Sequence, residues 1–173
     1  RVRFLVLALT TVAAFALSLT LAGCGYVAAN TLTPAQSQQL TTLARNAAVP
    51  DSSKVQTDLG GHGAVKVTVT VGWTPQIGIG DIAKEQERVK AICFREQQAV
   101  WMSGLPLHSA DVIVLGPVQD DYADMTIDAH AEAQLSSATA ATLAWAALTP
   151  DSAWSKYDSV WLRATYQPHV VGS

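Results

Sequence analysis

Residues 65–73 read Val-Lys-Val-Thr-Val-Thr-Val-Gly-Trp, and this stretch decides the fold. Apolar and polar residues alternate strictly, and most of them are β-branched, which is typical of a strand with one buried and one exposed face. The polar side of this strand carries Lys66, Thr68 and Thr70. We therefore expect a sheet that packs helices on one face and leaves the other face open.

The segments on either side of this strand predict helices and further strands. Residues 81–103 have the spacing of a long helix with an apolar stripe and a charged outer face that includes Glu85 and Arg88. Before the strand, Thr33-Pro34-Ala35-Gln36 has the capping pattern that begins a helix, which Pro50 ends. The remaining expected segments are a polar loop at 50–63, strands at 111–118, 123–135 and 159–167, and an Ala-rich helix at 137–148.

The order strand, helix, strand, strand, helix, strand is that of a ferredoxin-like fold. We expect an α+β domain with the βαββαβ order, an antiparallel sheet and helices on one face, preceded by an extra amphipathic helix. In that arrangement the strands 65–73 and 123–135 are neighbours at the centre of the sheet, and the strand 159–167 borders the first of them.

The first 24 residues have the pattern of a secretory signal. Arg1 and Arg3 are followed by an uncharged apolar run over residues 4–21, and then by Ala22, Gly23 and Cys24. A basic start, an apolar stretch and a small-residue exit are the three parts of such a signal. An uncleaved transmembrane helix is the alternative, since about 20 apolar residues span a bilayer, but no Lys or Arg follows before Arg45.

The end of this segment resembles a bacterial lipoprotein signal. Leu21, Ala22, Gly23 and Cys24 match its lipobox of a Leu, two small residues and a Cys. The resemblance implies a covalent diacylglycerol on the Cys24 thiol, cleavage between Gly23 and Cys24, and a lipid anchor on the extracytoplasmic face of the cell membrane. In overall layout only, the Ala-, Thr- and Val-rich chain is also similar to small uncharacterised envelope lipoproteins of actinobacteria.

The sequence thus divides into five expected parts: a signal peptide at 1–23, a lipidated tether at 24–33, an amphipathic helix and linker at 34–63, a two-layer α+β domain at 64–168 and a tail at 169–173. The chain carries a net charge of −3, and loss of Arg1 and Arg3 makes it more acidic. Nucleic acid is therefore not an expected partner, because its binding depends on clustered cations. With Cys24 lipidated, Cys93 has no partner for an intrachain disulfide, and we expect it buried on a helix.

One set of side chains is expected to gather on the uncovered face of the sheet. This candidate binding face consists of Lys66, Asp128, His130, Glu132, Trp161 and Arg163. Asp128, His130 and Glu132 are spaced two apart, so their side chains would project the same way about 7 Å from one another. A divalent cation is one interpretation, but such positions splay too far apart to share a metal. Pairing of Lys66 and Arg163 with the carboxylates across strands is the favoured interpretation.

The sequence contains no Walker, Gly-x-Ser-x-Gly, His-Glu-x-x-His or Cys-x-x-Cys motif. We therefore expect no catalytic or metal-ligating residue and no cofactor apart from the diacylglycerol. The leading hypothesis is a non-catalytic module that binds an envelope protein or glycan, with an exposed Trp161 as the contact. A metal-dependent or hydrolytic envelope enzyme around His130 is the alternative. A third reading is an assembly module that pairs through a sheet edge or through the helix at 34–48.

Overall fold

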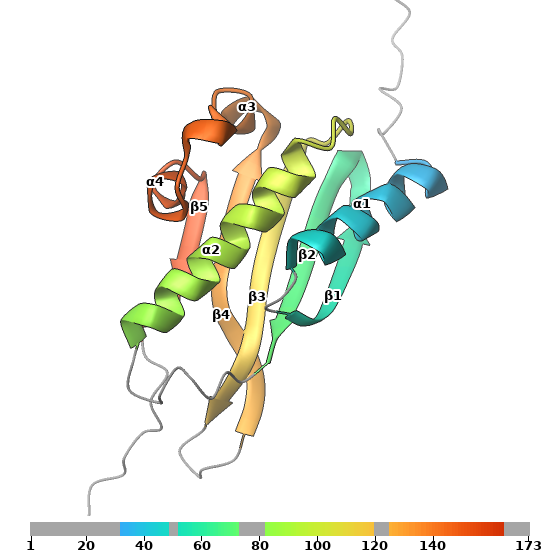
Figure 1. Ribbon diagram of the computed structural model, residues 1–173. Coiled ribbons are helices and arrows are strands. Elements are labelled where there is room, and N and C mark those ends of the chain that lie inside the picture. Colours follow the sequence, from blue (N-terminus) through green and yellow to red (C-terminus); the bar gives the residue numbers. More distant parts are fainter. Residues whose placement is uncertain (1–31, 49–51, 73–81, 120–124, 165–173) are drawn as a thin grey trace, which may run out of the picture.

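The computed structural model describes residues 32–48, 52–72, 82–119 and 125–164, which form a mixed sheet covered by helices (Figure 1). The helices and strands are, in chain order, α1 (Pro34–Ala48), β1 (Ser52–Leu59), η1 (Gly61–Gly63), β2 (Ala64–Val71), α2 (Ile82–Trp101), β3 (Ser109–Gln119), β4 (Met125–Ser136), α3 (Ser137–Ala140), η2 (Trp145–Ala147), α4 (Pro150–Trp154) and β5 (Ser159–Leu162). None of the helices in these ranges is long and apolar enough to span a membrane.

The sheet contains five strands in the order β1-β2-β3-β4-β5. The pair β2–β3 is parallel and is joined through α2, whereas the other three pairs are antiparallel. Helices α1 and α2 cross the same face of the sheet, and α4 packs against α2 (Figure 1). The α+β class with helices on one face is therefore as the sequence predicts.

The strand order differs from the ferredoxin-like expectation. β3 lies between β2 and β4, so the strand at 64–71 does not border the strand at 125–136. The other edge of β2 is occupied by β1, which forms within the segment expected to be a polar loop. With that edge filled, β5 pairs with β4 instead. The segment expected as a linker therefore belongs to the sheet.

The clearest sequence patterns are confirmed. Val65, Val67, Val69 and Val71 are all buried on the helix-covered side of β2, while Trp73 lies outside the described residues. The predicted helix at 81–103 is α2, whose buried side includes Val89, Ile92, Cys93 and Val100. The predicted cap of α1 is present: the N–H of Gln36 donates to Thr33 Oγ1 at 3.3 Å, and the N–H of Thr33 donates to Gln36 Oε1 at 2.8 Å.

The expected Ala-rich helix at 137–148 is wrong. Only the four residues of α3 are α-helical, and a turn then leads into η2. The ring of Trp145 packs 6.3 Å from that of Phe94 on α2, and its carbonyl accepts the side-chain amide of Gln98 at 3.4 Å. These contacts with α2 outweigh the helix propensity of the alanines, which is only a weak preference.

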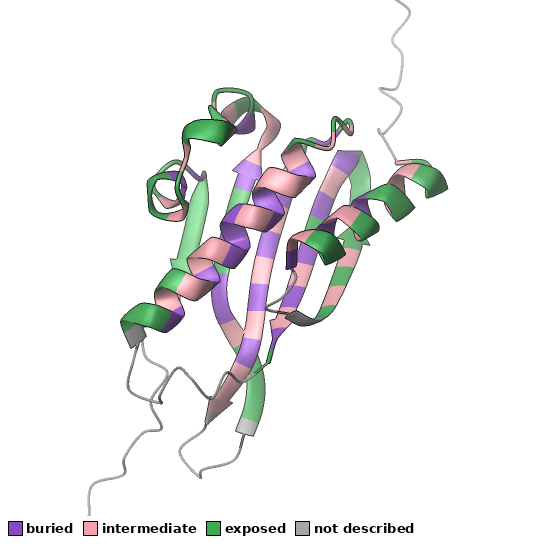
Figure 2. Ribbon diagram, in the orientation of Figure 1, coloured by how far each residue is buried: buried purple, intermediate pink, exposed green. Residues whose placement is uncertain are grey.

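The core lies between the sheet and α1 and α2, where the buried residues face one another (Figure 2). One polar side chain is at its centre. The amide of Gln97 is fully buried and donates to the carbonyls of Ala110 at 3.2 Å and Ala133 at 2.8 Å, and its oxygen accepts the indole N–H of Trp101 at 2.9 Å. These bonds tie α2 to both β3 and β4, as a fully satisfied buried polar group can.

Two other groups with ionisable side chains are sealed in the core. Cys93 is a free cysteine with no exposed surface, and burial raises the pKa of its thiol. Glu96 is also fully buried, and neither carboxyl oxygen has a hydrogen-bond partner among the described residues. Burial raises the pKa of Glu96 to about 8, against the opposing charge of Arg95. The carboxyl is therefore mostly protonated in the folded chain at neutral pH.

Glu96 should make the folded state less stable as the pH rises. Between about pH 4.5, where the unfolded carboxyl releases its proton, and about pH 8, the folded state holds a proton that the unfolded state has lost. The free energy of unfolding therefore falls with pH over that window. We predict that Glu96→Gln removes this fall, by a few kcal/mol in total. Urea titrations of both chains at pH 5 and pH 8 check it, and parallel pH profiles would contradict it.

Candidate functional site

A β-bulge in β4 determines where the predicted site residues lie. Val114 of β3 pairs with Ala131, but the next residue, Leu115, pairs with Ala129. His130 is therefore an extra residue in β4 that has no paired residue in β3. A bulge of this kind reverses which face the residues beyond it occupy.

The bulge overturns the expectation that His130 lies on the uncovered face with Asp128 and Glu132. His130 is only 2% exposed and faces α2 on the covered side, whereas Glu132 is exposed. Ile127, expected on the inner side of the same strand, is 59% exposed. The three side chains therefore do not form one row.

A glycine in β3 makes room for the imidazole. A Cβ atom at Gly116 would lie 2.6 Å from His130 Cε1 and 2.9 Å from both ring nitrogens. No residue with a side chain fits there unless the ring moves, because real Cβ atoms do not approach so closely. Glycine inside a strand is a known sign of a bulge or of a close approach. Gly116-Pro117 in the predicted strand is the sequence signal that could have located the bulge.

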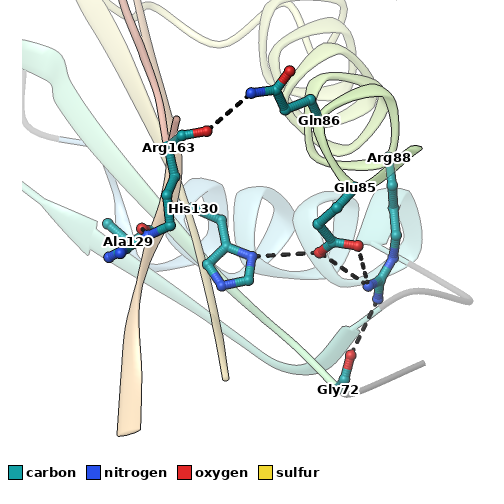
Figure 3. A network of polar contacts seen from close by, with 7 residues as sticks. All are labelled: Gly72, Glu85, Gln86, Arg88, Ala129, His130 and Arg163. Carbon is teal, nitrogen blue, oxygen red and sulfur yellow. Dashed lines mark hydrogen bonds and ion pairs between the residues drawn. The ribbon is translucent and has the colours of Figure 1, made fainter. Parts of the chain in front are cut away.

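The buried imidazole contacts a carboxylate from α2, which in turn binds a guanidinium from the same helix (Figure 3). His130 Nδ1 lies 3.4 Å from Glu85 Oε1, and Arg88 Nη1 donates to both oxygens of Glu85 at 3.3 Å. Arg88 Nη2 also donates to the carbonyl of Gly72 at 3.3 Å, just beyond β2. We call these four residues the Glu85–His130 network. It joins α2 to β4 and to the end of β2.

Glu85 is, after His130, a second residue of this network that the sequence pattern misplaced. It was expected on the charged outer face of the helix but is only 8% exposed. Burial disfavours its ionised form, yet the contacts with His130 and Arg88 outweigh burial and hold the pKa of its carboxyl below the usual value. An imidazole beside a carboxylate is also how enzymes orient a general base. Here the imidazole is 3% exposed, so its contacts are with the protein itself.

Arg163 and Asp128 come together just beyond the end of β5. They form an ion pair, while Arg163 Nε donates to the carbonyl of Ala129 at 2.8 Å. The backbone N–H of Ala129, and then Arg163, hold the pKa of Asp128 below its usual value. The guanidinium also lies 6.0 Å from the ring centre of Trp161, within reach of a cation–π interaction.

The opposite side of the sheet from the helices carries a second group of residues. By strand alternation and register this open sheet face presents Lys66, Asp111, Glu132 and Trp161. Lys66 Nζ lies 3.8 Å from Asp111, a residue of β3 that sequence reasoning missed, and not beside the carboxylates of β4. Burial, and then the charge of Glu132, raise the pKa of Asp111. Glu132 lies opposite Trp161, which is 46% exposed.

The candidate binding face is therefore divided among three places. Trp161, Glu132, Arg163 and Asp128 lie around β4 and β5, Lys66 lies on β2, two strands from β4, and His130 is on the covered side. Within the described ranges, no three His, Cys, Asp or Glu side chains are grouped closely enough to hold a metal ion. No protein-family model, curated protein or solved structure matches this chain.

The packing of His130 over Gly116 yields a prediction. Gly116→Ala should lower the free energy of unfolding by about 1–3 kcal/mol, because the new methyl group overlaps the ring. Gly61→Ala is the matched control, since a Cβ there meets nothing within 4 Å. The cost of Gly116→Ala should shrink when His130 is also replaced by Ala. Chemical denaturation of the original chain, Gly116→Ala, His130→Ala and the double variant measures this coupling, and an equal cost of Gly116→Ala in both backgrounds would show that the ring is not the obstacle.

Proposed function

We propose that this chain is a membrane-anchored extracytoplasmic lipoprotein whose folded domain binds an envelope protein or glycan and does not catalyse a reaction. Two independent features support the proposal. The signal-like segment at residues 1–24 closes with the lipobox at 21–24. The folded domain has a sheet face with an exposed aromatic residue. The lipobox sets the place of action, and the sheet face supplies the contact.

The anchor follows from the chemistry of Cys24. Once the thiol carries a diacylglycerol and the new amine is acylated, two or three acyl chains hold the protein in the bilayer, where one chain alone would not. The residues that precede the folded domain, from 24 to 33, then act as a tether. The acidic balance of the chain favours an anchor of this kind over electrostatic adhesion to anionic lipid.

The single observation that carries the binding proposal is the exposed Trp161 on the open sheet face. In the described part of the chain α1, α2 and α4 all lie on the other side of the sheet, so this indole has no helix over it. Tryptophan and arginine are, with tyrosine, the residue types enriched among those that dominate binding energies. Glu132 opposite the ring and Arg163 at 6.0 Å supply polar groups around an apolar surface. A peptide side chain or a sugar ring fits such a surface.

The enzyme hypothesis requires the imidazole of His130 among carboxylates on the exposed face. In the fold that imidazole is enclosed by Glu85, Arg88 and Gly116. Among Lys66, Asp111, Glu132 and Trp161 on the open sheet face, no nucleophile is placed beside a base. The geometry therefore favours binding.

Lipidation should be lost when Cys24 alone is changed. We predict that the full chain produced in a bacterium incorporates a radiolabelled fatty acid and fractionates with membranes, and that Cys24→Ser abolishes the label. Cys93→Ser is the matched control and should keep it, because that thiol is buried in the fold. Label retained by Cys24→Ser, or an intact mass that still includes residues 1–23, would contradict the anchor.

The open sheet face should lie within reach of the bound partner. We predict that a photo-crosslinking amino acid at position 134, where Gln134 is exposed on the same face and Trp161 is kept, yields a discrete adduct in the native envelope. The same group at position 102, where Met102 is 66% exposed at the end of α2, should not. Addition of excess unlabelled protein should compete the adduct away, whereas a Trp161→Ala competitor should be about tenfold weaker. Equal adducts from both positions would refute a specific role for this face.

A further inference from the structure

The outer edge of β1 is a strand edge that nothing in the described part of the chain covers. β1 pairs with β2 on one side only, so it is an edge strand of the sheet. It is eight residues long and contains no proline, and Leu59 near its end is 44% exposed. An edge of this kind is a template for pairing with another strand unless charges or covering elements prevent it.

The backbone groups that point outward can be assigned from the ladder. The N–H of Gly60 donates to the carbonyl of Ala64 at 2.9 Å, beside the pair Leu59–Val65. Hydrogen-bonded and non-hydrogen-bonded pairs alternate in an antiparallel ladder. The backbone groups of Lys54, Gln56 and Asp58 therefore point toward β2. Those of Val55, Thr57 and Leu59 point outward, where they can bond to a further strand.

The side chains on the open face of this strand are self-complementary. Lys54 and Asp58 are both exposed and have no ion-pair partner among the described residues, and Gln56 lies midway between them. If a second β1 runs antiparallel about a two-fold axis at Gln56, Lys54 lies opposite Asp58 of the partner subunit. The same axis places Val55 opposite the partner's Thr57, so the outward backbone groups also meet in register.

We propose that two copies of this chain pair through β1 about that axis, which joins their sheets into one. The charges of the open face then alternate across the junction. In one copy Asp111 neighbours Lys66 and Lys66 neighbours Asp58, and the next residue in the row is Lys54 of the partner subunit. Opposite charges directly across a strand pair are favourable, and like charges are unfavourable.

The charge pattern selects this register over its neighbours. A shift of the axis to Val55 or Thr57 leaves both charged side chains opposite uncharged residues. A further shift, to Lys54 or Asp58, places like charges opposite one another. Register in a strand pair is set by such side-chain matches.

The two-fold axis is perpendicular to the sheet, so both copies keep their helices on one side. The hydroxyl groups of Thr41 and Thr57 lie 2.6 Å apart, which holds α1 above β1. The two α1 helices therefore lie side by side over the junction. On the other side the two open sheet faces become one surface that presents both copies of Trp161 in the same direction.

Disulfide trapping tests the axis directly. In an antiparallel pair centred on residue 56, the two residues at that position form a non-hydrogen-bonded pair with Cα atoms about 4.5 Å apart, within the range of a disulfide. The full chain with Cys24→Ser and Gln56→Cys, in detergent micelles, should form a disulfide-linked dimer under mild oxidation. Gln134→Cys is the control, because that position is also exposed on the same face but lies three strands away. No dimer from Gln56→Cys, or as much dimer from Gln134→Cys, would overturn the proposal.

Charge reversal tests the register without cysteine chemistry. Lys54→Asp and Asp58→Lys should each weaken self-association by about tenfold in sedimentation equilibrium, since two favourable pairs become two unfavourable ones. The double variant restores both pairs and should return to within about threefold of the original affinity. An equimolar mixture of the two single variants should form a mixed dimer for the same reason. A double variant as weak as the singles, with native circular dichroism, would rule out this pairing.

Discussion

The imidazole of His130 over the bare backbone of Gly116 is the contact on which the arrangement of the sheet depends. The extra residue in β4 turns the ring toward α2, and the missing Cβ in β3 leaves space for it. From there the ring reaches Glu85, which Arg88 holds in turn. Because strand residues alternate between faces, this one insertion also decides which side chains of β4 remain on the open face.

The covered side of the sheet is a continuous apolar layer with a few buried polar groups, and they differ in how well they are satisfied. Gln97 uses its amide fully and joins α2 to two strands. Glu96, one residue earlier, has no hydrogen-bond partner among the described residues and stays protonated near neutral pH. Neighbouring positions on one helix therefore affect stability in opposite directions, since an unpaired buried carboxyl costs free energy that a satisfied amide does not.

Periodicity in the sequence located the elements whose burial is regular. The valines of β2 and the apolar stripe of α2 could be predicted because each reports a face fully packed against a neighbour. β1 could not, because an edge strand is half exposed and its sequence has only Val55 and Leu59 as apolar residues. The partner of Lys66 could not be predicted either, since it depends on strand order and not on local pattern. For the candidate site, alternation placed Trp161 and Glu132 on the open face, but not beside one another, and the bulge put His130 on the other side.

The sealed thiol of Cys93 has a practical consequence. An alkylating reagent reacts with thiolate, and here it must wait for the interface between α2 and the sheet to open. The rate of labelling at Cys93 therefore measures how readily that interface opens. At low reagent concentration the rate reports the equilibrium population of the open form, and at high concentration it approaches the opening rate itself. The protein thus contains its own kinetic probe of core opening, with no added dye or engineered residue.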